Sequence, residues 1–169
     1  MKLYSAVLSP FASRVRLAIY AKGLDIEITT PPLRPASAED KAKARLLARI
    51  GDLYLMSQGG GLFGQINPAT RNQAVVDETF QKLDEALAML NLFLGDGPYA
   101  VGQSLSTADC CLAPMMFYMG VFGQAFARQD VLGKHDKVAA YAAHLRTDPY
   151  VQKVYGEMQA ALQARMAAA

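Results

Sequence analysis

STADCCLAPMMFYMGVFGQA, residues 106–125, sets the architecture that we expect for this chain. Ser106 followed by Asp109 matches a capping box, in which a serine and an acid three residues later cap a helix start. No charged residue occurs between Asp109 and Arg128, so the helix that follows has no polar face. Because Pro114, two glycines and a glutamine interrupt it, a buried helix of a soluble helical domain fits better than a membrane span.

Further helices are predicted on both sides of this stretch. One begins at the cap residue Ser37 and is broken at Gly59–Gly61, and the next begins at Asn67, which precedes a proline. The second of these helices carries apolar residues spaced by three and four, a pattern typical of lengthwise packing on another helix. These residues are Val76, Phe80, Leu83, Leu87, Leu90 and Leu94. The predicted ranges are 38–58, 68–94, 134–145 and 150–164.

The first thirty residues show a different pattern, strand followed by helix followed by strand. We expect strands over 2–8 and 25–30, because both are rich in residues that favour extended structure. The helix between them spans 10–22, with Ser9 at its cap and Gly23 just after its end. Short links of this kind indicate a right-handed βαβ unit. The predicted fold class is α+β, mostly α, with this partial βαβ unit before an all-helical domain.

The amino-acid composition limits the classes of function that this chain can have. The chain has 169 residues, of which 52% are hydrophobic and 19% charged, and its net charge is +2. Such values exclude a disordered chain or a coiled-coil rod, and they imply neither nucleic acid nor an anionic membrane as a partner. Two cysteines make no disulfide framework, and Pro10 interrupts the first apolar run before it reaches the length of a signal peptide. We therefore expect a cytoplasmic protein.

Ser9 is the first candidate for chemistry, because it stands where a strand meets a helix N-terminus. The free N–H groups and partial positive charge of a helix start stabilise anions. A serine hydroxyl there can donate a hydrogen bond to a bound thiolate, which is the nucleophilic form of a thiol. The alternative is that Ser9 only caps the helix, and the residues themselves leave both open.

The remaining candidates are weaker. Cys110 and Cys111 are adjacent on an apolar helix, and we expect small buried side chains rather than a disulfide. His135 and His144 have no ligand cluster at metal-binding spacing, so no metal site is predicted. Residues 59–64, GGGLFG, lack the lysine of a phosphate loop. Aromatic and methionine side chains, Tyr54, Met115 and Tyr118 among them, either fill the core or line a pocket for an apolar molecule.

Several of these segments together resemble the cytosolic glutathione transferases. The opening MKLYSAVLSPFASRVRLAIYAKGLDIEI is similar to the first βαβ unit of their thioredoxin-like domain, and SPFASRVR to the first helix of serine- and cysteine-type classes. PPLRPASAEDKAKARLLARIGDLYL looks like their interdomain linker and first long C-terminal helix. VGQSLSTADCCLAP resembles the capping motif of their folding core. The resemblance covers nearly the whole chain.

The resemblance implies roles for particular residues. Ser9 would stabilise the thiolate of glutathione as the catalytic residue, and Ser9 and Phe11 would contact this co-substrate. An electrophilic, apolar second substrate would lie against Tyr54, Met115 and Tyr118. Ser106 and Asp109 would have a structural capping role. The resemblance also implies detoxification chemistry without a metal and a homodimer, in which we expect helices 38–58 and 68–94 to form the interface.

The chain departs from the family in length. We expect a partial glutathione-binding unit over 1–31, a linker over 32–37 and a helical domain over 38–169. About 50 residues of helix and strand that the family carries after the second strand are absent. Either the numbered sequence omits residues that the protein contains, or the deletion is real. Because a two-stranded sheet with one helix leaves edges and a face open, we favour omission, which an intact mass well above 18.3 kDa would support.

These expectations lead to two functional hypotheses. The first is a glutathione S-transferase, in which the thiolate held by Ser9 attacks the electrophile. The alternative is a non-enzymatic protein of the same fold that serves as a binding module or scaffold, which a real deletion would favour. Retention on glutathione-agarose distinguishes them, because a scaffold with half a site would not be retained. A defective truncated product would lack a cooperative unfolding transition.

Overall fold

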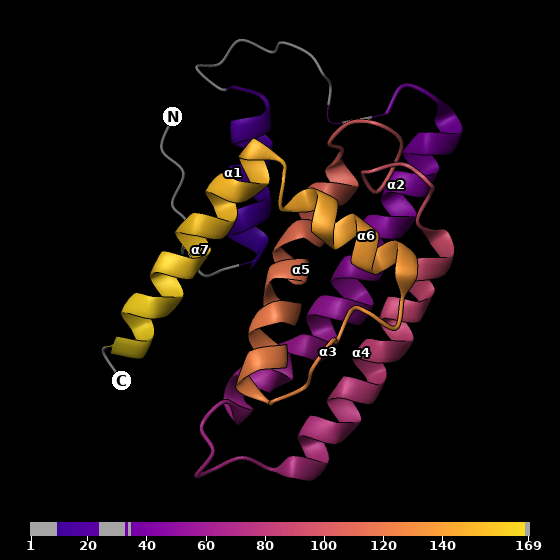
Figure 1. The fold of residues 1–169 in the computed structure, drawn as a ribbon. Helices are drawn as coiled ribbons and strands as arrows, with labels where there is room; N and C mark the ends of the chain where they lie inside the picture. The colour runs from indigo at the N-terminus through magenta and orange to yellow at the C-terminus, as the bar shows by residue number, and fades with distance from the viewer. Residues whose placement is uncertain (1–9, 24–32, 34, 168–169) are drawn as a thin grey trace.

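The computed structural model describes residues 10–23, 33 and 35–167, without the side chains of residues 10–12, 15 and 16. The described part of the chain is built from helices packed around one apolar core (Figure 1). In chain order these are α1 (Pro10–Ala21), α2 (Ala38–Ile50), η1 (Gly51–Met56), α3 (Ser57–Gly59), η2 (Gly60–Gln65), α4 (Gln73–Phe93), α5 (Thr107–Ala125), α6 (Asp136–Leu145) and α7 (Pro149–Ala167). The strands predicted over 2–8 and 25–30 lie outside the described residues.

Helix α1 ends where the sequence predicts. The N–H of Gly23 donates to the carbonyl of Tyr20 at 3.0 Å, and Gly23 has a φ of +57°. Glycine adopts this left-handed conformation without the steric cost that a Cβ atom brings. The prediction of a helix over 10–22 is therefore confirmed to within one residue.

The predicted helix over 38–58 is confirmed at its start and wrong at its end. The hydroxyl of Ser37 accepts a hydrogen bond from the Asp40 N–H at 2.9 Å and caps α2. The chain then stays helical through a π-helical turn, η1, a short α3 and a 3₁₀ turn, η2, as far as Gln65. Gly59 does not break the helix. Instead, the absence of a side chain there lets the helix pack closely against Phe122. A Cβ atom there would lie 3.3 Å from Cε2 of Phe122.

Helix α4 begins five residues later than predicted. The side chain of Asn72 caps it, with Oδ1 accepting from the N–H groups of Ala74 and Val75 at 3.1 and 3.3 Å. Asn67 instead closes a turn, since its Oδ1 accepts from the Ala69 N–H at 3.0 Å. The side chain of Gln65 accepts from the Asn72 N–H at 2.7 Å and holds the loop before the new cap. Tertiary contacts therefore choose between two plausible caps.

The apolar seam of α4 faces the core. Phe80 is half-buried, and the other five residues of the seam are buried. Helix α4 packs against α2 and η1 on one side and α6 on another, as the lengthwise spacing predicts. In Figure 1, α4 runs beside the helical stretch formed by α2, η1 and α3.

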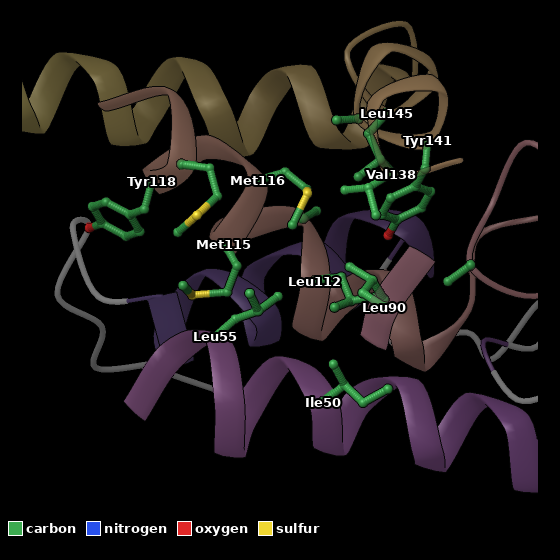
Figure 2. Packing of buried hydrophobic residues seen from close by; sticks show 14 of the residues in the cluster. Ile50, Leu55, Leu90, Leu112, Met115, Met116, Tyr118, Val138, Tyr141 and Leu145 are labelled. Carbon is green, nitrogen blue, oxygen red and sulfur yellow. The ribbon is translucent and has the colours of Figure 1, made fainter. Parts of the chain in front are cut away.

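Helix α5 is the centre of the molecule. It packs against α1, α2, η1, α6 and α7, which explains why it has no polar face. Figure 2 shows Leu112, Met115 and Met116 of α5 between Leu55 and Ile50 on one side and Val138 and Leu145 of α6 on another. None of the helices in the described ranges is long and apolar enough to cross a bilayer.

The residue at position 33 joins the core although it belongs to the predicted linker. The side chain of Leu33 is buried, and its carbonyl accepts a hydrogen bond from the N–H of Thr107 at 2.7 Å. Thr107 is the first residue of α5, whose leading N–H groups lack partners within the helix. Residue 33 thus supplies a hydrogen-bond partner to the start of the central helix.

Candidate functional site

The N-terminal end of α1 is where the sequence places its first candidate. Ser9 immediately precedes Pro10, the first residue of α1, and lies outside the described residues, as does the side chain of Phe11. The inward face of α1 is described, and it buries Ser13 and Leu17 completely. Helix α1 packs against α5 and α7 (Figure 1), so the helix start has a fixed place in the molecule.

The start of α1 has the partial positive charge of a helix N-terminus. The first turn of α1 contains no acidic residue that would offset the positive end of the helix. Arg14 follows one turn later and forms an ion pair with Asp52 of η1. This pair could not be predicted from the sequence, because its members are far apart in the chain and no local pattern links them.

The three residues predicted to line an apolar pocket do not share one environment. Tyr54 on η1 is 45% exposed, whereas Met115 and Tyr118 on α5 are 1% and 3% exposed. Figure 2 shows Met115 directed at Leu55, with Tyr118 one turn further along α5. Two hollows among the described residues are lined by other side chains. The structure therefore places Met115 and Tyr118 in the core and Tyr54 at the surface.

Phe63 is an aromatic residue in contact with Tyr118 that the sequence pattern did not indicate. It lies on η2 and is exposed, and its ring meets the rings of Tyr118 and Phe122 edge-on, at centroid distances of 5.0 and 5.1 Å. Its place among the glycines of residues 59–64, a segment without the features of a phosphate loop, is the one sequence signal that marks it. Phe63 gives the exposed surface over Tyr118 an aromatic character.

The start of α5 is a buried polar network. Oδ2 of Asp109 accepts from the N–H and the hydroxyl of Ser106, both at 2.7 Å, and the Ser106 hydroxyl accepts from the Ala108 N–H at 3.3 Å. Oδ1 accepts from the Ala100 N–H at 2.8 Å and from the Tyr141 hydroxyl at 3.0 Å. Burial raises the pKa of Asp109, and these hydrogen bonds act in the opposite direction. All partners are donors within the fold, so this network holds structure together.

The cysteines have no feature of a nucleophile. Burial raises the pKa of Cys110 to about 12 and also raises the pKa of Cys111. A thiol with a raised pKa is protonated at neutral pH, and the thiolate is the reactive form. Cys110 is buried and Cys111 half-buried, in line with the expectation of small core side chains.

Both histidines are half-buried. His135 is half-buried and its Nε2 lies 3.1 Å from Oδ1 of Asp84, while the ring of His144 packs edge-on against Tyr99 at 4.8 Å. Within the described ranges, no group of three or more His, Cys, Asp or Glu side chains is placed to hold a metal ion.

Comparisons with known proteins agree with this arrangement of helices. The family described as "Glutathione S-transferase, C-terminal domain" matches residues 73–144. No curated protein matches the sequence significantly. The chain is similar in structure to a glutathione S-transferase from Methylobacterium radiotolerans in complex with glutathione sulfonate, with 19% identity, a TM-score of 0.70, and coverage of 89% of this chain and 92% of that one.

Two further solved structures are similar. Glutathione S-transferase I from maize, in complex with an atrazine glutathione conjugate, is 23% identical with a TM-score of 0.73, covering 93% of this chain and 97% of that one. Maleylpyruvate isomerase from Pseudomonas aeruginosa is 17% identical with a TM-score of 0.69, covering 94% and 97%. At these identities the likeness establishes the fold, which is mostly helical with the C-terminal domain architecture of glutathione transferases.

Proposed function

We propose that this protein is a glutathione transferase of the serine type, in which Ser9 stabilises the glutathione thiolate. The family match over residues 73–144 and the glutathione transferases among the structural neighbours support the reaction class. Ser9 as the catalytic residue, with Phe11 beside glutathione, is carried by the resemblance of SPFASRVR to the first helix of that family.

The observation that carries the proposal is the placement of α1. This helix packs against α5 and α7, and its first turn contains no acidic residue. Ser9 is the residue directly before it. A thiolate at this end of the helix would be attracted by the partial positive charge of the helix N-terminus. It would also accept a hydrogen bond from the serine hydroxyl. Both interactions lower the pKa of a thiol and increase its nucleophilic fraction.

The proposed reaction needs no protein thiol. The glutathione sulfur forms a bond to an electrophilic carbon of the second substrate, either by addition or with departure of a leaving group. Positions 9, 12 and 13 carry Ser, Ala and Ser, so a mixed disulfide with this segment is not possible. This composition favours the transferase mode over a glutaredoxin-like mode.

We propose that the second substrate lies where η1, η2 and α5 meet. The exposed Tyr54 would contribute a wall, and Met115 and Tyr118 the apolar floor beneath it. Phe63 adds an exposed ring in contact with Tyr118. Aromatic and methionine side chains suit a planar apolar electrophile, because they provide area and adaptable shape.

The proposed organisation follows from the same resemblance. Residues 1–31 would form the partial glutathione-binding unit, 32–37 the linker and 38–169 the helical domain. We further propose a cytoplasmic homodimer with a role in detoxification, in which the outer faces of α2, η1 and α4 meet. Leu46, Leu53 and Leu92 are exposed on these elements, which supports this choice of interface.

The proposal is tested by the substitution Ser9→Ala. With glutathione and 1-chloro-2,4-dinitrobenzene as substrates, we expect kcat/KM to fall about 100-fold, since one donor to a developing or bound anion is lost. The protein should stay folded, with a melting temperature only slightly lowered, because loss of a capping hydroxyl costs about 1 kcal/mol. The matched control is Ser104→Ala, an exposed serine before α5, which should leave activity unchanged.

Two results would contradict the proposal. Wild-type activity in the Ser9→Ala variant would exclude Ser9 as the thiolate-stabilising residue. Failure of the wild-type protein to be retained on glutathione-agarose would exclude the transferase and leave the scaffold hypothesis.

A further inference from the structure

Arg71 lies in the loop between η2 and α4, and its guanidinium joins two helix ends that are far apart in the chain. Its Nε donates a hydrogen bond to the carbonyl of Gln65 at 3.0 Å, and its Nη2 donates to the carbonyl of Ile66 at 3.1 Å. The same Nη2 donates to the carbonyl of Ala125 at 3.2 Å. Gln65 is the last residue of η2, and Ala125 is the last residue of α5. One side chain therefore caps both C-termini.

These carbonyls belong to the groups that a helix leaves without a partner. The last carbonyls of a helix accept no hydrogen bond from within it, and they carry its partial negative charge. A guanidinium suits this position, because it is always charged and presents its N–H donors in a rigid planar fork. The Cζ atom of Arg71 also lies 4.6 Å from the centroid of the Phe126 ring, which is buried at the C-cap of α5. A hydrogen bond and a cation–π contact thus fix the side chain at the end of α5.

Helix η2 needs such support, because its own sequence stabilises it poorly. Runs of 3₁₀ helix longer than about three or four residues are uncommon, and η2 has six. Three of them, Gly60, Gly61 and Gly64, are glycines at which a Cβ atom would meet nothing within 4 Å. Glycine loses more conformational freedom on folding than any other residue. The buried side chain of Leu62 anchors the middle of η2, and Arg71 holds its end.

Phe63 is the side chain whose place depends on this support. It lies two residues before the capped end of η2 and is 42% exposed. Its ring contacts the rings of Tyr118 and Phe122 in the second half of α5. Because Arg71 binds the end of η2 to the end of α5, it ties together the two elements whose rings meet.

We propose that Arg71 is a positioning residue for the second substrate, and that it acts through Phe63. By capping η2 and α5 together, it holds the Phe63 ring beside Tyr118, where a planar aromatic electrophile would pack against the exposed part of the ring. Arg71 need not touch that substrate, because it acts through the backbone of η2. The inference rests on the proposed glutathione transferase function, and it adds the residue that sets the preference for aromatic substrates.

The first test compares kinetic constants of the full chain and its variants. With glutathione and 1-chloro-2,4-dinitrobenzene, we expect Arg71→Gln to raise the KM for the aromatic substrate about fivefold. The kcat and the KM for glutathione should stay within about twofold, since the thiolate and its surroundings are unaltered. The matched control is Arg128→Gln, which removes a cation just after the end of α5. Because Arg128 pairs with Asp77 of α4, its loss should leave both KM values unchanged.

A double-mutant cycle shows whether Arg71 acts through Phe63. Phe63→Leu keeps an apolar side chain and removes the ring, so we expect it to raise the KM for the aromatic substrate by a similar factor. Adding Arg71→Gln to Phe63→Leu should then change this KM by less than about 1.5-fold, because the ring that Arg71 positions is already absent. Arg71→Lys, which keeps the charge and loses the fork, takes the place of Arg71→Gln if glutamine prevents folding.

A structural measurement makes the inference independent of turnover. In nuclear Overhauser spectra of the protein with labelled phenylalanine and tyrosine, we expect cross-peaks between the ring protons of Phe63 and Tyr118 in the wild-type and Arg128→Gln proteins. Arg71→Gln should weaken them by about half or more. Absence of turnover in the wild-type protein would contradict the proposed function alone, and these cross-peaks would then decide whether Arg71 positions Phe63.

Two outcomes would overturn the inference. One is a change in the KM for the aromatic substrate on Arg71→Gln that is the same in the wild-type and Phe63→Leu backgrounds, including no change in either. The other is an Arg71→Gln protein whose cross-peaks between Phe63 and Tyr118 are undiminished.

Discussion

At the scale of single residues, the buried carboxylate of Asp109 connects three parts of the chain. It receives hydrogen bonds from the loop before α5, from the start of α5 and from α6, through Ala100, Ser106 and Tyr141. The capping pattern predicted the bond to Ser106, because both residues are local. The bonds to Ala100 and Tyr141 depend on tertiary structure and had no sequence signal.

Asp109→Asn should therefore destabilise the protein strongly. The amide places an NH₂ group among donors, so we expect a loss of about 2–4 kcal/mol in the free energy of unfolding. Ser106→Ala, which removes the cap hydroxyl, should cost about 1–2 kcal/mol. Urea unfolding followed by circular dichroism measures both, with Asp136→Asn on exposed α6 surface as a control. Equal losses in Asp109→Asn and Asp136→Asn would show that the network contributes nothing.

Tyr99 gives a prediction about pH. Its hydroxyl donates to Oδ2 of Asp148 at 2.8 Å, and burial, followed by this bond, raises its pKa from 10 to about 12. Because the folded pKa is above the unfolded one, the proton stabilises the folded state. That contribution is complete below pH 10 and is lost as the pH rises through about 12.

The stability difference between the wild-type protein and Tyr99→Phe should follow this window. We expect a constant difference below pH 10 that shrinks as the pH approaches 12, measured by urea unfolding at each pH. Other tyrosines titrate in both proteins and cancel in the comparison. A difference that stays constant or grows over this range would contradict the assigned shift.

At the scale of helices, boundaries were predictable where a local cap had no competitor. Ser37, Ser106 and Gly23 marked α2, α5 and α1 to within a residue. The predicted start of α4 was wrong, because Asn67 and Asn72 are both acceptable caps. The contact of Gln65 with the Asn72 N–H, which the sequence cannot show, selects the second. The π-helical turn η1 was likewise missed, since its residues have ordinary helix patterning.

Substituting the two asparagines separates these alternatives. Asn72→Ala should reduce the free energy of unfolding by about 1 kcal/mol, as loss of an N-cap does, whereas Asn67→Ala should cost less than about 0.5 kcal/mol. Both are read from urea unfolding in parallel. A larger loss of unfolding free energy in Asn67→Ala than in Asn72→Ala would show that Asn67 caps the helix and that α4 begins earlier.

At the scale of the whole molecule, the central position of α5 explains why the sequence could not separate core residues from candidates for the apolar pocket. A helix that is apolar on every side gives no periodicity to distinguish core from pocket. Met115 and Tyr118 of α5 are buried, whereas Tyr54 of η1 is exposed. Which neighbour covers each face of α5 is decided by long-range packing. Phe63 reaches Tyr118 through such packing.

The proposed dimer is testable at this scale. Leu92 on α4 is 74% exposed, and we expect Leu92→Glu combined with Leu53→Glu to raise the dimer dissociation constant about 100-fold or more, because charges would be buried at the interface. Size-exclusion chromatography with light scattering measures the change. Met166→Glu, an exposed position on α7, is the control and should remain dimeric. A wild-type protein that is monomeric would refute the interface.

The hydrogen bond from Thr107 to the carbonyl of Leu33 has a consequence for the modular use of this fold. Leu33 is structurally part of the helical body, although it precedes the first helix of that body in sequence. A recombinant chimera that grafts a foreign N-terminal unit at residue 37 would remove the buried Leu33 side chain, which holds this backbone carbonyl beside the first N–H of the central helix. The natural crossover point for exchanging the two halves therefore lies before Leu33.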